Sequence, residues 1–142
     1  MRLIGFSFLK IHAEKLSSKL SADTKVNTNI NIVDIQEVKS EVFNSKESLL
    51  SVKFDYNISY DPDYANVSFS GMVLISLPTK EAKEISKQWK ESKFPEEFKL
   101  FLFNVILKRS NLKALQLEEE LNLPSHIPLP SLKIPSKDIP KK

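Results

Sequence analysis

Residues 50–60, LSVKFDYNISY, alternate apolar and polar side chains over their whole length. Successive side chains of a β-strand point to opposite faces of its sheet, so this pattern predicts a strand with one buried and one solvated face. The predicted buried residues are Leu50, Val52, Phe54, Tyr56, Ile58 and Tyr60.

The next four residues, DPDY at 61–64, predict a reversal of the chain. Pro62 has a fixed φ that suits a turn, and Asp61 and Asp63 can accept hydrogen bonds from nearby backbone N–H groups. Alternation then resumes, so residues 49–77 predict a long antiparallel hairpin. The apolar residues of its second strand are Ala65, Val67, Phe69, Gly71, Val73, Ile75 and Leu77.

Two earlier segments also predict strands, but their apolar side chains change parity. In residues 3–13 the apolar positions move from Ile4, Phe6 and Phe8 to Leu9, Ile11 and Ala13. In residues 29–39 they move from Ile30 and Ile32 to Val33 and Ile35. Such a change indicates a β-bulge or a strand covered on both faces. We expect the polar residues 14–29 between the two segments to contain a crossover or loop.

After Pro78 the apolar period becomes helical. Thr79 is a candidate N-cap, and Ala82, Ile85 and Trp89 follow at helical spacing. A first helix is therefore expected to end near residues 92–95.

A second helix is predicted from Pro95, followed by Glu96 and Glu97 at the positive end of the helix dipole. It has two apolar stripes, and we expect part of the second to contact another subunit. The sequence RSNL at residues 109–112 suggests a kink or a division of this helix. The first stripe contains Phe98, Phe101, Leu102, Val105 and Ile106, and the second contains Leu100, Phe103 and Leu107.

Four strands followed by two helices predict an α+β fold, with helices on one face of an antiparallel sheet. A chain of 142 residues can bury one adequate core. We expect a single domain over residues 1–132 and a basic, proline-containing tail over residues 133–142. Residues 121–132, LNLPSHIPLPSL, are expected to pack as an extended strap on the sheet or helices, because proline fixes φ in advance.

Composition disfavours several functional classes. The 21 basic and 18 acidic residues give a net charge of only +3, which does not favour nucleic-acid binding. The chain has no cysteine, so it has no disulfide and no cysteine-based metal site. No apolar run approaches the roughly 18 residues of a membrane span, and the start does not match a signal peptide. We expect a soluble, cytoplasmic protein that does not insert into membranes.

Candidate catalytic residues are few. His12 and His126 have no acidic or hydroxyl partner at a recognised spacing, so each is interpreted as a packed or surface residue. Glu118–Glu120 are interpreted as a solvated helix face, and Asp61 and Asp63 as turn residues rather than calcium ligands. Trp89, within the lysine-rich residues 80–93, is assigned to the core rather than to nucleic-acid stacking. The sequence therefore predicts a binding protein and no enzyme, with no cofactor and no metal.

Four features follow one another along the chain: the hairpin YDPDYA, the strand VSFSGMV, a short helix, and a long helix leading into LNLPSHIPLPSL. In this order they resemble the SecB-like protein superfamily, most closely its uncharacterised archaeal-type members. The resemblance implies a sheet with a crossover after the first strand. It also implies a cytoplasmic, ATP-independent holding chaperone that forms dimers or tetramers and holds unfolded or nascent polypeptide in apolar grooves.

Matched by position, the resemblance implies a peptide-binding groove formed by Phe6, Phe8, Leu9, Ile11, Ile30, Ile32, Val33, Leu123, Ile127, Leu129 and Leu132. A link to protein export is less favoured, because Lys53 and uncharged residues accompany Asp55 where the bacterial chaperone carries an acidic patch. The alternatives are a dedicated chaperone or adaptor for one partner, for example an antitoxin, and, less favoured, nucleic-acid binding.

Overall fold

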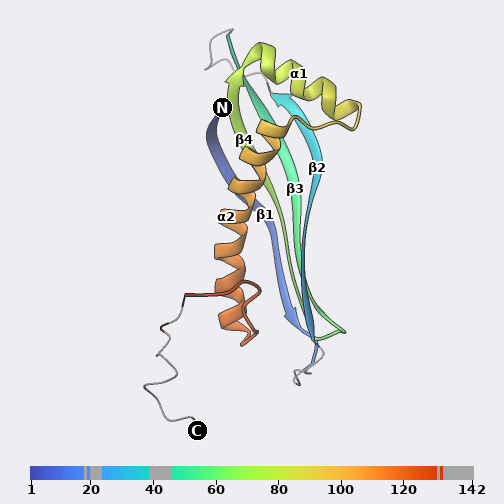
Figure 1. Ribbon diagram of the computed structural model, residues 1–142, viewed down its shortest axis with the longest axis vertical. Helices are drawn as coiled ribbons and strands as arrows, with labels where there is room; N and C mark the ends of the chain where they lie inside the picture. The colour runs from blue at the N-terminus through green and yellow to red at the C-terminus, as the bar shows by residue number, and fades with distance from the viewer. Residues whose placement is uncertain (18, 20–23, 39–45, 131, 133–142) are drawn as a thin grey trace, which may run out of the picture.

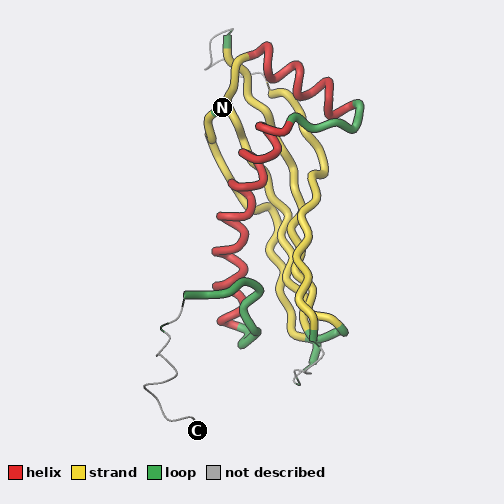
Figure 2. Tube along the Cα trace, viewed as in Figure 1, coloured by secondary structure: helices red, strands yellow, loops and turns green. Residues whose placement is uncertain are grey.

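The computed structural model describes residues 1–17, 19, 24–38, 46–130 and 132. The predicted tail at 133–142 and part of the predicted crossover lie outside these residues. Four strands precede two helices, which confirms the predicted α+β class (Figures 1 and 2). The elements are β1 (Arg2–Lys15), β2 (Lys25–Val38), β3 (Glu47–Asp61), β4 (Ala65–Pro78), α1 (Thr79–Lys90) and α2 (Glu96–Glu120).

The four strands form one antiparallel sheet in the order β1-β4-β3-β2. The chain therefore crosses from one edge of the sheet to the other between β1 and β2, as predicted. The first residues after β1 lie at the turn of the β3–β4 hairpin, where the backbone N–H groups of Leu16 and Ser17 donate to the Tyr64 carbonyl at 2.8 and 3.2 Å.

The β3–β4 hairpin provides the centre of the core. All six apolar residues predicted for the buried face of β3 are at most 1% exposed. We call this the inner face of the sheet, because the buried residues of α1 and α2 pack against it. Gly71 lies on this face of β4 under the ring of Phe54, and a Cβ at Gly71 would lie only 2.5 Å from the Phe54 Cζ.

The parity changes in the outer strands are β-bulges. Of the two predicted explanations, a bulge or a strand covered on both faces, the first therefore applies. The register of β1 with β4 shifts between Phe8 and Lys10, and that of β2 with β3 shifts between Ile32 and Asp34. Leu9 and Val33 are the extra residues and are 59% and 49% exposed. β1 also has an earlier shift, between Leu3 and Gly5.

The helix α2 is continuous, so the predicted division at residues 109–112 is wrong. Its buried side chains recur at every fourth residue: Phe98, Leu102, Ile106, Ser110, Ala114 and Glu118. Ser110 and Asn111 are compatible with an unbroken helix because both face the sheet. Ser110 continues the buried stripe, and Asn111 accepts a hydrogen bond from Tyr56 of β3. The N-cap is Pro95, with Glu96 and Glu97 in the first turn.

The helix α1 buries Ala82 and Ile85 as predicted, and Trp89 is half-buried against the core. Its N-cap is Pro78 and not Thr79, since Thr79 is the first helical residue and its hydroxyl accepts a hydrogen bond from Ser48 at 3.1 Å. No helix among the described residues is long and apolar enough to cross a membrane.

The two helices end with the same hydrogen-bond pattern. After α2, Asn122 has a left-handed φ of 55°, and its N–H donates to the Glu119 carbonyl while that of Leu123 donates to Glu118. After α1, Ser92 occupies the equivalent position with a φ of 61°. This is the Schellman motif. At the end of α2 it turns the chain back toward the helix.

Candidate functional site

The helix α2 lies on the inner face of the sheet and has two flanks. On one flank the Arg109 guanidinium lies 5.8 Å from the centroid of the Phe6 ring on β1. On the other flank Asn111 accepts a hydrogen bond from the Tyr56 hydroxyl of β3 at 2.6 Å. The flank of Arg109 therefore faces the edge strand β1, and the flank of Asn111 faces the centre of the sheet.

A cavity of about 350 Å³ opens between α2 and β1, and we call it the β1–α2 cavity. The rings of Phe6 and Phe8 contact each other edge to face, with centroids 5.1 Å apart, and both are half-buried. Leu112 is 62% exposed on the helix side. The cavity is lined by Phe6, Ser7, Phe8, Arg109, Leu112, Lys113 and Gln116.

Apolar side chains continue along β1 beyond the cavity. Ile4, Leu9 and Ile11 are 40%, 59% and 45% exposed. β1 is an edge strand that pairs with β4 alone, so one side of its backbone has no strand partner in the described chain. Proteins usually protect long edges of this kind, because such edges pair with other chains. The β1 edge therefore combines free backbone groups with an apolar surface.

The predicted groove residues of β2 lie at the opposite edge of the sheet. Ile30 and Ile32 are half-buried and pack against the core, and Val33 is exposed at the bulge. Because β4 and β3 separate the two edges, a single subunit does not bring the β1 and β2 residues together.

The described part of the strap, residues 121–130 and 132, follows α2, and its first residues fold back along the end of that helix (Figure 1). Leu123 is 8% exposed and belongs to the core, and Ile127 is half-buried. Leu129 and Leu132 are 54% and 101% exposed. The first half of the strap packs as predicted, whereas the last predicted groove residues point to solvent.

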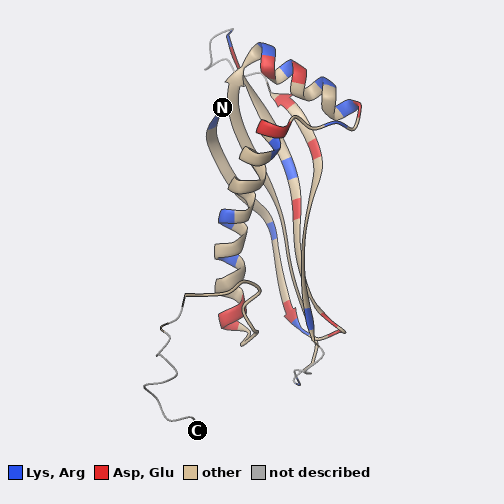
Figure 3. Cartoon of the chain, in the orientation of Figure 1, with Lys and Arg blue, Asp and Glu red and all other residues tan. Residues whose placement is uncertain are grey.

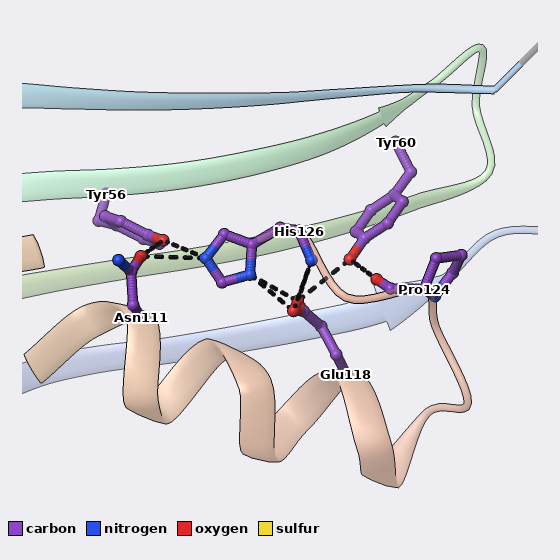
Figure 4. A network of polar contacts seen from close by, with 6 residues as sticks. All are labelled: Tyr56, Tyr60, Asn111, Glu118, Pro124 and His126. Atoms are coloured by element: carbon purple, nitrogen blue, oxygen red, sulfur yellow. Dashed lines mark hydrogen bonds and ion pairs between the residues drawn. The ribbon is translucent and has the colours of Figure 1, made fainter. Parts of the chain in front are cut away.

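A buried polar network fixes the strap (Figure 4). Nδ1 of His126 lies 2.6 and 2.8 Å from the two Glu118 carboxylate oxygens, and the His126 backbone N–H donates to Glu118 Oε1 at 3.1 Å. The Tyr60 hydroxyl lies 3.2 Å from Glu118 Oε2 and 2.5 Å from the Pro124 carbonyl oxygen. These contacts join α2, the strap and β3.

The other ring nitrogen of His126 completes the network. Nε2 lies 3.0 Å from Asn111 Oδ1 and 3.0 Å from the Tyr56 hydroxyl oxygen. The Asn111 oxygen and the Glu118 carboxylate only accept hydrogen bonds. Nδ1 of His126 is therefore the donor to Glu118, and Nε2 lies within hydrogen-bond distance of both Asn111 and Tyr56. We call Tyr56, Tyr60, Asn111, Glu118 and His126 the clasp.

The tyrosines of the clasp have shifted acidity. Burial raises the pKa of Tyr56 and that of Tyr60 well above the usual range, and the charge of Glu118 raises both further. No residue of the clasp lines the β1–α2 cavity or the smaller cavity between α1 and α2. The network is therefore suited to holding the strap in place.

Two sequence interpretations are corrected here. Glu118 is 1% exposed and not part of a solvated face, and His126, although packed as interpreted, has an acidic partner eight residues away. Glu118 is the last of the buried residues that recur at every fourth position of α2. This spacing was the signal in the sequence from which its burial could have been predicted. The turn after α2 had a local signal, Asn122 followed by Pro124, which marks a helix end but does not show that His126 returns over Glu118.

The remaining polar candidates lie at the surface. His12 is exposed on β1 and lies 3.6 Å from Glu14. Asp61 accepts hydrogen bonds from the Asn27 amide and the Ser59 hydroxyl, and Asp63 has a φ of 47°, which agrees with a turn role. Within the described ranges, no three His, Asp or Glu side chains are grouped to hold a metal ion.

Comparison with known proteins gives one structural relationship. No protein-family model and no curated protein sequence matches the chain. A solved structure of the Mycobacterium tuberculosis SecB-like chaperone Rv1957, in complex with a ChAD peptide from the Rv1956 HigA1 antitoxin, is similar with a TM-score of 0.53 and 11% identity. The match covers 94% of this chain and 91% of that chain. It confirms a SecB-like fold, but does not support the archaeal-type assignment.

Proposed function

We propose that this chain is an ATP-independent holding chaperone that binds unfolded or partly folded polypeptide along the β1 edge and in the β1–α2 cavity. The observation that carries the proposal is the adjacency of this cavity, which has Phe6 and Phe8 on one wall, to a free edge strand with exposed Leu9 and Ile11. Unfolded chains offer both backbone groups and apolar side chains, and this surface accepts both.

The geometry suits an extended client. A segment added to β1 would form backbone hydrogen bonds that do not depend on sequence, while alternate side chains would reach the cavity. Burial of apolar area contributes about 25 cal/mol per Å², so length rather than exact fit would provide affinity. Phe6 and Phe8 would form the floor of the site, and Leu9 and Ile11 its extension.

The other predicted groove residues would join the binding surface only in an oligomer. Ile30, Ile32 and Val33 lie at the far edge of the sheet, and Leu129 and Leu132 lie beyond the buried part of the strap. In a homodimer or homotetramer these surfaces would extend the β1 site of a neighbouring subunit. The exposed Leu100 of α2 supports the proposal that further subunit contacts exist.

A second candidate is a dedicated chaperone or adaptor for one partner protein. It is favoured by the structural neighbour, whose structure contains a peptide from an antitoxin. A cytoplasmic location is expected in both cases, and a link to protein export stays the weaker proposal.

The test is the aggregation of several unrelated denatured proteins, measured by light scattering with the chain at stoichiometric concentration and without nucleotide. General suppression supports the holding chaperone, and no suppression of any client contradicts it. Recovery of a single stoichiometric partner by affinity purification would favour the dedicated role. Nucleic-acid binding would require an affinity that falls steeply with salt.

A further inference from the structure

The β1–α2 cavity carries two cations without acidic partners. Arg109 and Lys113 both line it, and the other lining residues are apolar or uncharged. In the part of the chain that the structure describes, neither cation forms an ion pair, and the Lys113 ammonium donates only to the Gln116 side chain at 3.3 Å. Both charges are therefore available to a bound molecule.

The surrounding helix strengthens this positive field. Acidic residues occupy only the two ends of α2 (Figure 3). Between residues 98 and 117 the helix contains Lys99, Lys108, Arg109 and Lys113 and no Asp or Glu. A cleft lined by one sign of charge with apolar walls concentrates the field inside it. The field in the β1–α2 cavity favours an anionic group.

The apolar and cationic parts of the cavity lie on opposite walls that are close together. Phe6 and Phe8 come from β1, while Arg109 and Lys113 are one helical turn apart on α2. The Arg109 guanidinium is 5.8 Å from the Phe6 ring centroid. One ligand can therefore contact an aromatic ring and a cation at once.

Building on the proposed function, we infer that the cavity selects extended peptide segments in which an apolar side chain is followed or preceded, two residues away, by Asp or Glu. Side chains two residues apart lie on the same side of an extended chain, separated by about 7 Å. The apolar side chain would occupy the aromatic floor. The carboxylate would reach the fork of Arg109 or the ammonium of Lys113.

The chain's own tail does not match this ligand. Residues 133–142, KIPSKDIPKK, contain four lysines and one aspartate, so their charge has the same sign as the cavity. Charge complementarity instead favours an acidic segment of another protein.

The test uses the full chain and three labelled peptides of about 12 residues, measured by fluorescence anisotropy. The peptides share alternating Leu and Ser positions and differ only in whether Asp, Asn or Lys is placed two residues from a central Leu. The Asp peptide is expected to bind about tenfold more tightly than the Lys peptide, with the Asn peptide between them, and salt should reduce the difference.

The double variant Arg109→Gln, Lys113→Gln should reduce the difference between the Asp and Lys peptides to about twofold or less, while binding of the Asn peptide changes little. The matched control is Lys83→Gln, Lys90→Gln, which removes two exposed charges of α1 that do not line the cavity and should preserve the order. Equal binding of all three peptides, or equal losses in both double variants, would overturn the selectivity but leave the holding function intact. No binding of any peptide would overturn this inference, and the aggregation test would separately decide the proposed function.

Discussion

Nδ1 of His126 lies 2.6 Å from Oε1 of Glu118, and the two side chains are 0% and 2% exposed. This contact joins the strap to α2, and Tyr56 and Tyr60 connect it to the sheet. Polar groups this deeply buried need their hydrogen-bond partners, because a group left without one has lost its hydration and gained nothing in return. The position of the strap should therefore depend on the clasp.

Replacing Glu118 with Gln should destabilise the protein by about 2 kcal/mol, because an amide keeps one acceptor oxygen where the carboxylate has two, so buried donors of His126 and Tyr60 would lose a partner. The free energy of unfolding in urea measures this. Glu119→Gln is the matched control: Glu119 is exposed on the same turn, and the change should stay within about 0.5 kcal/mol. Equal effects of the two substitutions would show that the clasp does not stabilise the fold.

The tyrosines of the clasp predict a loss of stability at alkaline pH. Burial raises the pKa of Tyr56 and Tyr60, so the folded state binds their protons more tightly than the unfolded state does. Their contribution is complete below the unfolded value of about 10 and is lost as pH rises from there toward the folded values. Unfolding measured between about pH 9 and 11 should lose less stability in Tyr56→Phe than in the unsubstituted chain. Parallel pH profiles would contradict this account.

Gly71→Ala should destabilise the sheet by about 2 kcal/mol or more, since the new methyl group would overlap the Phe54 ring and approach the Ser7 carbonyl oxygen. Gly5→Ala is the control, because its Cβ would lie 3.7 Å from the nearest atom of Leu74. Thermal unfolding of both variants should give a large loss for Gly71 and little for Gly5. Similar losses would mean that the Phe54 ring does not require a glycine beneath it.

Ser110→Ala should leave stability unchanged or raise it by up to about 1 kcal/mol. The Ser110 hydroxyl is buried and has no hydrogen-bond partner among the described residues, and alanine has the higher helix propensity. Urea unfolding of the variant checks this. A loss above about 1 kcal/mol would indicate that the hydroxyl makes a bond that the folded structure needs.

The sheet was largely predictable because its signals are local. Alternation over residues 50–60 placed the hairpin and its buried face, and both parity changes marked bulges, at Leu9 and Val33. A period of two determines which side chains face the core, so an extra residue in a strand is visible in the sequence as a shift of parity.

The predicted division of α2 and the predicted solvated position of Glu118 were wrong because burial there depends on distant residues. Asn111 and Glu118 are polar, yet Tyr56 and Tyr60, more than fifty positions away, satisfy them. The left-handed turn that returns the strap to the helix uses Asn122, followed by Pro124; this pattern marks a helix end but does not show where the strap packs. Long-range partners and such turns cannot be inferred from periodicity alone.

The central claim is that clients bind at the β1–α2 cavity, and Leu112 and Leu100 test it most directly. Both are 62% exposed on α2, but only Leu112 lines the cavity. With folding and oligomeric state first verified by circular dichroism and light scattering, the affinity for a denatured client is compared between Leu112→Ser and Leu100→Ser. The account predicts a loss of about fivefold or more for Leu112→Ser and little change for Leu100→Ser. Equal affinities in the two variants would contradict it.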